Sequence, residues 1–552
     1  MTTPNEKTNL SRRTFVGAGA AMAVGATLPR SSSADTRMRE RATTRAQSFA
    51  IEEKSIDDLR TAMEHGELTA HTITQQYLDR IASMDRQGLM LRHVIETNPD
   101  ALSIADALDA ERKSGRVRGP LHGIPVLVKD NIDTADRMTT TAGSLALAGS
   151  IAQRDAHIVG RLREAGAIIL GKTNLSEWAN FRSSHSSSGW SGRGGQARNP
   201  YALDRTPSGS SSGSAGAVAS SYCAVAVGTE TDGSITSPSA ACSLVGVKPT
   251  IGLVSRSGII PIAHSQDTAG PMARSVRDAA ILLGVLAHVD DRDPAMKNVR
   301  IARNIDYTTY LVERGLAGAR IGVARKRYTG YSVATDAQFE KALGVMKEQG
   351  AIIVDPADIV TAGKFDDAEF EVLLFEFKTD LAAYLAALPA GARARTLDDL
   401  IAFNRAHAKE EMPHFGQEIF EQATKKGSLS SASYKKALAS CRTLARTQGI
   451  DATLLKHKLD AIVAPTQGPP SLIDLVNGDP GGGGSSTSPC AVAGYPAITV
   501  PMGYSWGLPL GITFMGAAWS EPTLFKLAYA FEQASKARVA PQYLATAKVG
   551  AD

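Results

Sequence analysis

Cysteine is scarce in this sequence, with four residues in 552. Cys223, Cys242, Cys441 and Cys490 form no CxxC pair, and no HExxH spacing occurs among the eleven histidines. Metal sites in proteins are usually built from such closely spaced ligands. We therefore predict no metal site, and the sequence leaves open whether any of the cysteines pair.

The chain also lacks a strong charge bias and a long apolar run. Its formal net charge of +4 over 552 residues is too small to predict a nucleic-acid surface. No uninterrupted apolar stretch reaches the roughly 18 residues that a membrane-spanning helix needs. With 43% hydrophobic and 21% charged residues, the composition is typical of a globular enzyme. We predict no nucleic-acid partner and no membrane anchoring of the mature chain.

The first 34 residues have the order of an export signal. Residues 11–16 read SRRTFV, residues 17–28 are weakly apolar, and a small-residue stretch ends near Ala34. A basic segment followed by an apolar and then a small-residue segment is typical of a cleaved signal, and paired arginines indicate the twin-arginine route. We therefore predict a signal peptide over residues 1–34 and a periplasmic or secreted enzyme. The alternative is a disordered basic leader in which the arginine pair is accidental.

Beyond residue 50, short apolar runs alternate with helical patterns. Ser55 and Thr69 precede apolar residues at helical spacing, as helix caps do. Buried strands are predicted at residues 126–128, 168–170, 224–227, 321–323, 352–354, 462–464 and 497–500. This alternation indicates an α/β protein with a buried, mostly parallel sheet. Length alone would favour two to four domains.

Two segments rich in small residues lie between the predicted strands and helices. Residues 208–214 read SGSSSGS, and residues 228–234 read GTETDGS. A flexible linker would explain the first segment, but linkers do not usually lie inside an α/β alternation. Small residues allow the backbone to approach closely around a site. These two segments are therefore the best candidates for a functional site.

Together with their flanks, the two segments resemble the amidase signature. The resemblance covers residues 204–241, and further blocks follow the family's pattern at residues 123–131, 171–177, 246–275 and 494–501. It spans about residues 50 to 540. It implies one large amidase-signature domain, placed at residues 50–545, with a mixed sheet flanked by helices on both faces.

The resemblance implies an amidase with a Ser-Ser-Lys triad. Ser234 corresponds to the nucleophile that forms the acyl-enzyme, Ser210 to a bridging serine whose peptide bond with Gly209 is cis in the family, and Lys129 to the base. No histidine occurs in these motifs, so a lysine has to accept the proton, and burial has to lower its pKa. The family's reaction requires no cofactor.

Further roles follow from the same comparison. In the family, backbone N–H groups bind the oxyanion, and here they belong to Thr231, Asp232, Gly233 and Ser234. Ser211 is expected to hydrogen-bond Lys129. If the resemblance were accidental, these serines would serve only to form turns.

Departures from the family pattern indicate the substrate. Asp232 and Glu230 replace glycine and aspartate, and Ser208 and Ser212 replace glycines. This version is similar to bacterial peptide amidases, which hydrolyse the C-terminal carboxamide of peptides and release ammonia. Asn180 and Phe181 are candidates for contacting the peptide, although core packing explains Phe181 equally well.

Other motifs are interpreted as structural. Residues 166–173 match the phosphate-loop pattern GxxxxGK[ST], but the four intervening residues read as a strand. Residues 433–436 match SxxK without the partner motifs of penicillin-recognising enzymes, and a surface helix is expected. Residues 264–267 contain triad residue types too close together to face one another. His122 is expected to pack beside the lysine strand.

Two alternative functions remain. One component of a tRNA-dependent amidotransferase would use the same triad to release ammonia from glutamine, but such a protein works in the cytoplasm with partner chains, which the predicted export signal disfavours. A binding protein without activity would need none of the three triad residues. A small-molecule or peptide amide is therefore the expected partner, and the sequence does not indicate the oligomeric state.

Overall fold

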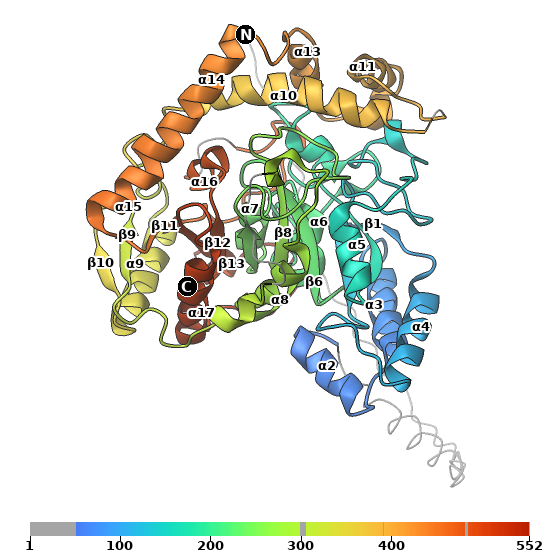
Figure 1. Cartoon of the computed structure of the whole chain (residues 1–552), viewed down its shortest axis with the longest axis horizontal. Coiled ribbons are helices and arrows are strands. Elements are labelled where there is room, and N and C mark those ends of the chain that lie inside the picture. Colours follow the sequence, from blue (N-terminus) through green and yellow to red (C-terminus); the bar gives the residue numbers. More distant parts are fainter. Residues whose placement is uncertain (1–50, 298–304, 390, 481–483, 551–552) are drawn as a thin grey trace, which may run out of the picture. The chain divides into compact units, whose positions relative to one another are not determined.

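An eleven-stranded mixed sheet organises the chain from Ile51 onward, which forms one compact unit (Figure 1). The computed structural model describes residues 51–297, 305–389, 391–480 and 484–550. The predicted signal at residues 1–34 lies outside them. The strands are β1 (Val94–Thr97), β2 (Pro125–Lys129), β3 (Ile168–Thr173), β6 (Val225–Glu230), β7 (Val245–Lys248), β8 (Thr268–Ala273), β9 (Arg320–Val323), β10 (Ile352–Val354), β11 (Ala461–Pro465), β12 (Ala497–Ser505) and β13 (Leu508–Met515).

The strand order is β1-β3-β2-β6-β8-β7-β12-β13-β11-β9-β10. Four neighbouring pairs are parallel and six are antiparallel. The predicted large α/β domain with a mixed sheet is confirmed, whereas the expectation of a mostly parallel sheet is wrong. Short apolar strands that are buried on both faces look alike in sequence whichever way their neighbours run, which explains the error.

Helices cover both faces of this sheet. On one face α5 (His157–Glu164), α8 (Val276–Leu286), α17 (Glu521–Ser535) and α9 (Val333–Glu348) pack side by side. On the other face lie α6 (Ser212–Ala219) and α7 (Thr236–Ala241), which contact each other. Both α7 and α17 contact β12 and β13, and no extensive contact joins the two helices within the described chain, so they lie on opposite sides of the sheet.

The predicted helix caps are confirmed near the start of the described chain. Ser55 and Thr69 cap α2 (Ile56–Glu64) and α3 (Ala70–Met84), and each forms a reciprocal capping box with the residue three positions later. The helix α4 (Ala101–Lys113) packs against α3 and against β3, the second strand of the sheet. The sequence therefore indicates these helix starts correctly.

A second helical group packs beside the carboxyl end of β2. It includes α10 (Asp366–Ala386), α11 (Leu397–Ala406), α13 (Glu418–Thr424) and α14 (Ala432–Arg442), which Figure 1 shows along one margin of the sheet. Phe377, Leu381 and Phe420 from this group share one core with Trp178 and Ile260. The group thereby encloses the loops that follow the central strands. The remaining helices are α12 (Ala408–Glu411), α15 (Asp451–His457) and α16 (Ser488–Ala493).

The motifs interpreted as structural lie where the sequence predicts. Lys172 of the phosphate-loop pattern is buried in β3 and donates to the Ile132 carbonyl at 2.7 Å, so it is not free to hold a phosphate. Ser433 lies on the exposed side of α14. His122 is buried, and its Nε2 lies 3.0 Å from the Leu108 carbonyl.

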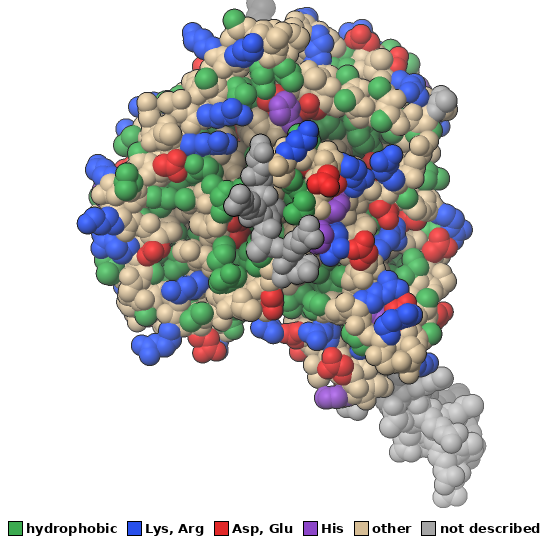
Figure 2. Space-filling view, viewed as in Figure 1, with side chains coloured by type: hydrophobic (Ala, Val, Ile, Leu, Met, Phe, Trp, Pro, Cys, Tyr) green, Lys and Arg blue, Asp and Glu red, His purple; other side chains and the backbone are tan. Residues whose placement is uncertain are grey.

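Basic and acidic side chains are interspersed over the face that Figure 2 shows, and they gather in no single-sign patch on it. Along the described chain, every helix is too short or too polar to cross a bilayer.

Candidate active site

Three chain segments meet at one edge of the sheet. Lys129 is the last residue of β2, Ser234 follows the neighbouring strand β6, and Ser210 precedes α6. Strands β2 and β6 are parallel, with Val126 opposite Val225, so both release their following loops at the same edge. The sheet therefore brings together residues that lie up to 105 positions apart in the chain.

Lys129 is fully buried and points at Ser210. Its Nζ lies 2.7 Å from the Ser210 Oγ and 2.9 Å from the Thr229 Oγ1. Burial lowers the pKa of Lys129 to about 7, although the negative charges of Asp267 and Glu230 oppose the change. The amine can therefore exist in its neutral form near neutral pH and accept a proton.

Ser210 and Ser234 are linked through the backbone. The peptide bond between Gly209 and Ser210 is cis. The next N–H, that of Ser211, donates to the Ser234 carbonyl at 3.2 Å. Ser234 retains 8% of its exposure, and no hydrogen bond joins its hydroxyl to that of Ser210 within the described chain. The structure thus joins Lys129 to Ser210 directly and holds Ser234 beside them.

The expected hydrogen bond between Ser211 and Lys129 is not formed among the described residues. The Ser211 hydroxyl donates to the Thr229 carbonyl at 3.0 Å and accepts from the Thr229 N–H at 3.2 Å. Thr229 makes the expected contact instead, because its Oγ1 lies beside the Lys129 Nζ and also receives the Asn131 side-chain amide at 3.0 Å. Thr229 lies in the GTETDGS segment, which is a sequence signal for its contact with Lys129. From sequence alone, however, a hydroxyl near a strand end cannot be distinguished from one that only closes a turn.

The turn from Thr231 to Ser234 presents free backbone donors. Gly233 has φ +77°, a left-handed conformation that suits glycine, and an added Cβ would lie 2.9 Å from the Ser237 Oγ. Among the described residues, the N–H groups of Asp232, Gly233 and Ser234 have no protein acceptor. Adjacent unpartnered N–H groups form a site for negative charge.

Glu230 fixes the helix that follows this turn. Its Oε2 accepts from the N–H groups of Ile235 and Thr236 at 2.8 and 2.9 Å, at the start of α7. The carboxylate replaces the usual capping side chain at this helix end. The beginning of α7 and the preceding Ser234 therefore keep a defined position relative to β6.

A cavity of about 340 Å³ adjoins these groups. Asn131, Thr229 and Thr231 line it nearest to Lys129. Its other walls come from the loop 256–264, residues 292–294, α10 and Ala179. Most of the exposed wall is apolar, with Ile260, Ile262 and Ala383 among the lining residues, and Arg256, Arg292 and Asp380 add charged groups. The cavity can therefore receive an apolar group of modest size beside the turn.

The two predicted substrate contacts differ in their surroundings. Asn180 is half-buried, and its Nδ2 donates to the Ser188 Oγ at 3.1 Å while its Oδ1 has no partner. It ends a run of three residues with positive φ, from Trp178 to Asn180. Phe181 packs edge-on against Phe377, with ring centroids 5.1 Å apart, in the core beside α10. Core packing, the alternative considered for Phe181, accounts for its position.

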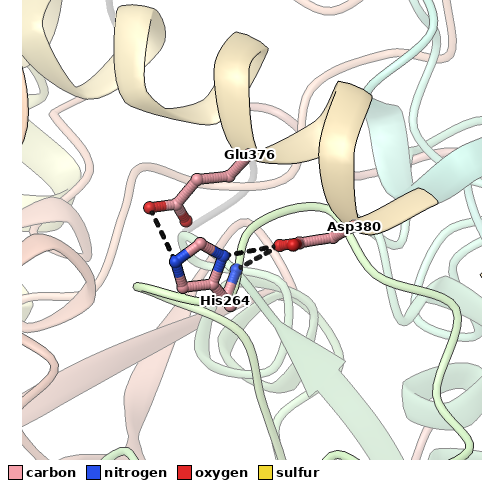
Figure 3. A group of neighbouring side chains, drawn as sticks. All are labelled: His264, Glu376 and Asp380. Atoms are coloured by element: carbon pink, nitrogen blue, oxygen red, sulfur yellow. Dashed lines mark hydrogen bonds and ion pairs between the residues drawn. The ribbon is translucent and has the colours of Figure 1, made fainter. Parts of the chain in front are cut away.

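His264 connects the cavity wall to α10. Its Nδ1 lies 2.8 Å from Asp380 and its Nε2 lies 3.4 Å from Glu376 (Figure 3). Burial opposes protonation of this ring, but the two carboxylates outweigh it and raise the pKa of His264. Because both ring nitrogens face acids, the geometry suits a protonated imidazole that holds the loop 256–264 against the helix.

The chain matches a known protein family over most of its length. A family model described as Amidase matches residues 72–525. The chain belongs to the amidase family. This amidase is therefore a hydrolase that acts on amide C–N bonds.

Known amidases resemble it over most of their length. The structure of the native peptide amidase of Stenotrophomonas maltophilia is 51% identical, with a TM-score of 0.86, and covers 90% of this amidase and 100% of that chain. A probable amidase of Arabidopsis thaliana is 42% identical over 506 residues, covering 90% of this amidase and 93% of the plant protein. A glutamyl-tRNA(Gln) amidotransferase component from Caldanaerobacter subterraneus is 35% identical, with 88% and 98% covered.

Proposed function

We propose that this amidase hydrolyses the C-terminal carboxamide of peptides through an acyl-enzyme on Ser234. The observation that carries the mechanism is the 2.7 Å contact between the fully buried Lys129 amine and the Ser210 hydroxyl. A serine hydroxyl needs a base to become an effective nucleophile, and a neutral lysine can be that base. The similarity to a peptide amidase supports the substrate class.

In the proposed reaction the Ser234 Oγ attacks the carboxamide carbon. Its proton passes to the Ser210 Oγ, while the Ser210 proton passes to the Lys129 amine. The free N–H groups of Asp232, Gly233 and Ser234 receive the developing oxyanion. Collapse of the intermediate breaks the C–N bond, and the returned proton lets ammonia leave. Water then attacks the ester by the same route and releases the peptide with a free carboxylate.

The cavity beside the turn supports a peptide as substrate. A leaving ammonia group is small, so most binding energy has to come from contacts on the acyl side. We propose that the cavity lined by Ile260, Ile262 and Ala383 holds the side chain next to the carboxamide. The unpartnered Oδ1 of Asn180 is a suitable acceptor for a peptide N–H group.

A substrate panel tests this function. We expect kcat/KM for a tripeptide amide to exceed that for acetamide at least about tenfold, equivalent to roughly 1.4 kcal/mol. Mass spectrometry should show a gain of about one dalton per peptide, as expected when –NH₂ becomes –OH, with every internal bond intact. Preference for free glutamine would favour the amidotransferase-type alternative, and preference for simple aliphatic amides would refute the peptide substrate.

We also propose that the enzyme is exported by the twin-arginine route, because Arg12 and Arg13 precede a weakly apolar run. Replacing both with lysine should leave the precursor in the cytoplasm, where immunoblotting of cell fractions would detect it. A matched variant with Arg39 and Arg41 replaced should be exported normally. Export of the paired-lysine variant at the normal rate would refute the route.

A further inference from the structure

One side of helix α10 carries three acids. Glu369, Glu376 and Asp380 are spaced by seven and four residues, which places them on the same side of the helix. Glu376 and Asp380 contact His264, as Figure 3 shows. Glu369 lies seven residues before Glu376 on the helix. It does not pair with His264 but reaches the turn that precedes Ser234.

Glu369 contacts this turn in two ways. Its Oε1 accepts from Gln266 Nε2 at 2.8 Å, and the same amide nitrogen lies 3.3 Å from the Thr231 carbonyl. Its carboxyl group is also within hydrogen-bonding reach of the Asp232 carboxyl. Asp232 in turn accepts from the Thr487 Oγ1 at 2.5 Å. Glu369 retains 8% exposure, so water competes little for these contacts.

Two carboxyl groups can hydrogen-bond each other only if one carries a proton, because ionised carboxylates have no donor. The positive charge of Lys248 acts on Asp232, but its Nζ donates to the Tyr495 carbonyl at 2.8 Å and forms no ion pair with either acid among the described residues. Burial and mutual repulsion raise the pKa of Glu369 well above its ordinary value, and burial also raises that of Asp232. The other titratable groups around the pair are Glu230, Tyr328, Asp366, Cys441 and Cys490.

We propose that Glu369 is a positioning residue for the oxyanion-binding turn, which it holds against α10 by sharing one proton with Asp232. The inference rests on the proposed acyl-enzyme reaction at Ser234. Among the described residues, Glu369 forms no hydrogen bond with Ser234 or Lys129, and it acts through the backbone of residues 231–233.

The shared proton makes the turn sensitive to alkaline pH. A carboxyl group whose pKa is raised in the folded state holds its proton where the unfolded chain has lost it, so the bond weakens as pH rises. Once both acids are ionised they repel each other across the bond that joined them. The N–H groups of the turn would then leave the position that suits the oxyanion, and kcat would fall.

Glu369→Gln tests the shared proton. In this variant the new amide can donate to the Asp232 carboxylate without titrating. We expect kcat at neutral pH within about threefold of wild type, and the alkaline fall of kcat should be absent or shifted upwards. Glu369→Leu should lower kcat at least about tenfold with little change in KM, because the turn loses its support. Asp367→Asn, an exposed acid on the same helix, should leave the whole profile unchanged.

Infrared difference spectra separate this inference from the proposed function. Wild type minus Glu369→Gln should show the C=O stretch of a protonated carboxyl group at neutral pH, and the band should disappear at alkaline pH. An alkaline limb that is unchanged in Glu369→Gln, or the absence of that band, would overturn the inference. If the wild type hydrolysed no amide while the band was present, the proposed function would fail and the carboxyl pair would stand.

Discussion

The Lys129 Nζ lies 2.7 Å from the Ser210 Oγ, in a place where no carboxylate comes within ion-pair distance of the amine among the described residues. Buried lysines elsewhere in the sheet are held by main-chain carbonyls, as Lys172 is by Ile132 at 2.7 Å. Lys129 instead faces mainly hydroxyl groups, which can donate to a neutral amine as well as accept from a charged one. Its surroundings therefore tolerate both protonation states.

Ser234→Ala should abolish amide hydrolysis while leaving the thermal transition close to that of wild type. Loss of the nucleophile should lower kcat by about 10³-fold or more, as with other triad knockouts. Steady-state kinetics on a peptide amide and scanning calorimetry would measure both effects. Ser220→Ala, which removes a buried hydroxyl at the opposite end of α6, is the control and should keep full activity. Substantial turnover by Ser234→Ala would exclude this nucleophile.

Activity should rise with pH as Lys129 loses its proton. Burial lowers the pKa of Lys129 to about 7, so the neutral base predominates above that pH and the protonated form below it. The profile of kcat/KM should therefore show a one-proton acid limb centred near pH 7. Lys129→Ala should lose most activity and this limb together. A limb that survived in the residual activity would have to come from another group.

Lys129→Met should stabilise the fold at neutral pH although it inactivates the enzyme. Between about pH 7 and 10.4 the unfolded chain binds a proton that the folded lysine does not, so wild-type stability rises with pH in this window. The methionine variant has no amine to deprotonate on folding, so its free energy of unfolding is not reduced in this way. We expect its Tm at pH 7 to exceed that of wild type by roughly 1–3 °C, with the difference narrowing towards about pH 10. A lower Tm at pH 7 would contradict the depressed pKa.

Filling the cavity should alter substrate choice without damaging the triad. Ala383 is exposed on α10 and lines the cavity, whereas its neighbour Ala382 is exposed and does not. Ala383→Trp should lower kcat/KM about tenfold for peptide amides with a bulky final side chain, and much less for those ending in glycine amide. Ala382→Trp should change neither. Equal losses for both substrates would show that the cavity does not hold this side chain.

Arg182→Leu should destabilise the fold strongly. The guanidinium is fully buried, contacts Glu177, and lies 3.5 Å from Glu411. Removing it leaves buried acids without a counter-charge, which costs about 3–5 kcal/mol. Urea unfolding should show this loss, whereas Arg137→Leu, which breaks an exposed pair with Asp100, should leave the free energy of unfolding nearly unchanged. A small effect of Arg182→Leu would mean that the acids take up protons at little cost.

The sequence predicts the parts of the site that lie in continuous motifs. Lys129, Ser210 and Ser234 are recognisable because each stands in a short pattern with a fixed neighbourhood. Glu369 and Gln266 carry no such pattern, since they reach the turn from elements 137 and 34 residues beyond Asp232. Contacts of this kind depend on how α10 packs, which periodicity does not determine. The Ser211 hydroxyl bonds to Thr229 rather than to Lys129 for a related reason: the direction of a side chain at a helix start depends on the local backbone, which the sequence pattern does not determine.

The sequence likewise predicts the elements of the fold but not how they are arranged. The alternation of strands and helices follows from apolar runs and caps such as Ser55, which act locally. The direction of a strand does not follow from its apolar run. Strand β6 is parallel to β2 but antiparallel to β8, and its residues are buried against both. Direction depends on the connections that bring each strand back to the sheet.

Residues 208–214 are glycine and serine because neighbouring atoms leave little room for larger side chains. An added Cβ at Gly209 would lie 2.3 Å from the Ser176 Oγ, and one at Gly213 would lie 2.3 Å from the His93 carbonyl oxygen. Neither position can therefore accept even alanine without moving its neighbours. During divergence such a segment should change more slowly than its monotonous composition suggests. Comparisons that set aside repetitive stretches as uninformative would discard the part of this chain that best identifies it.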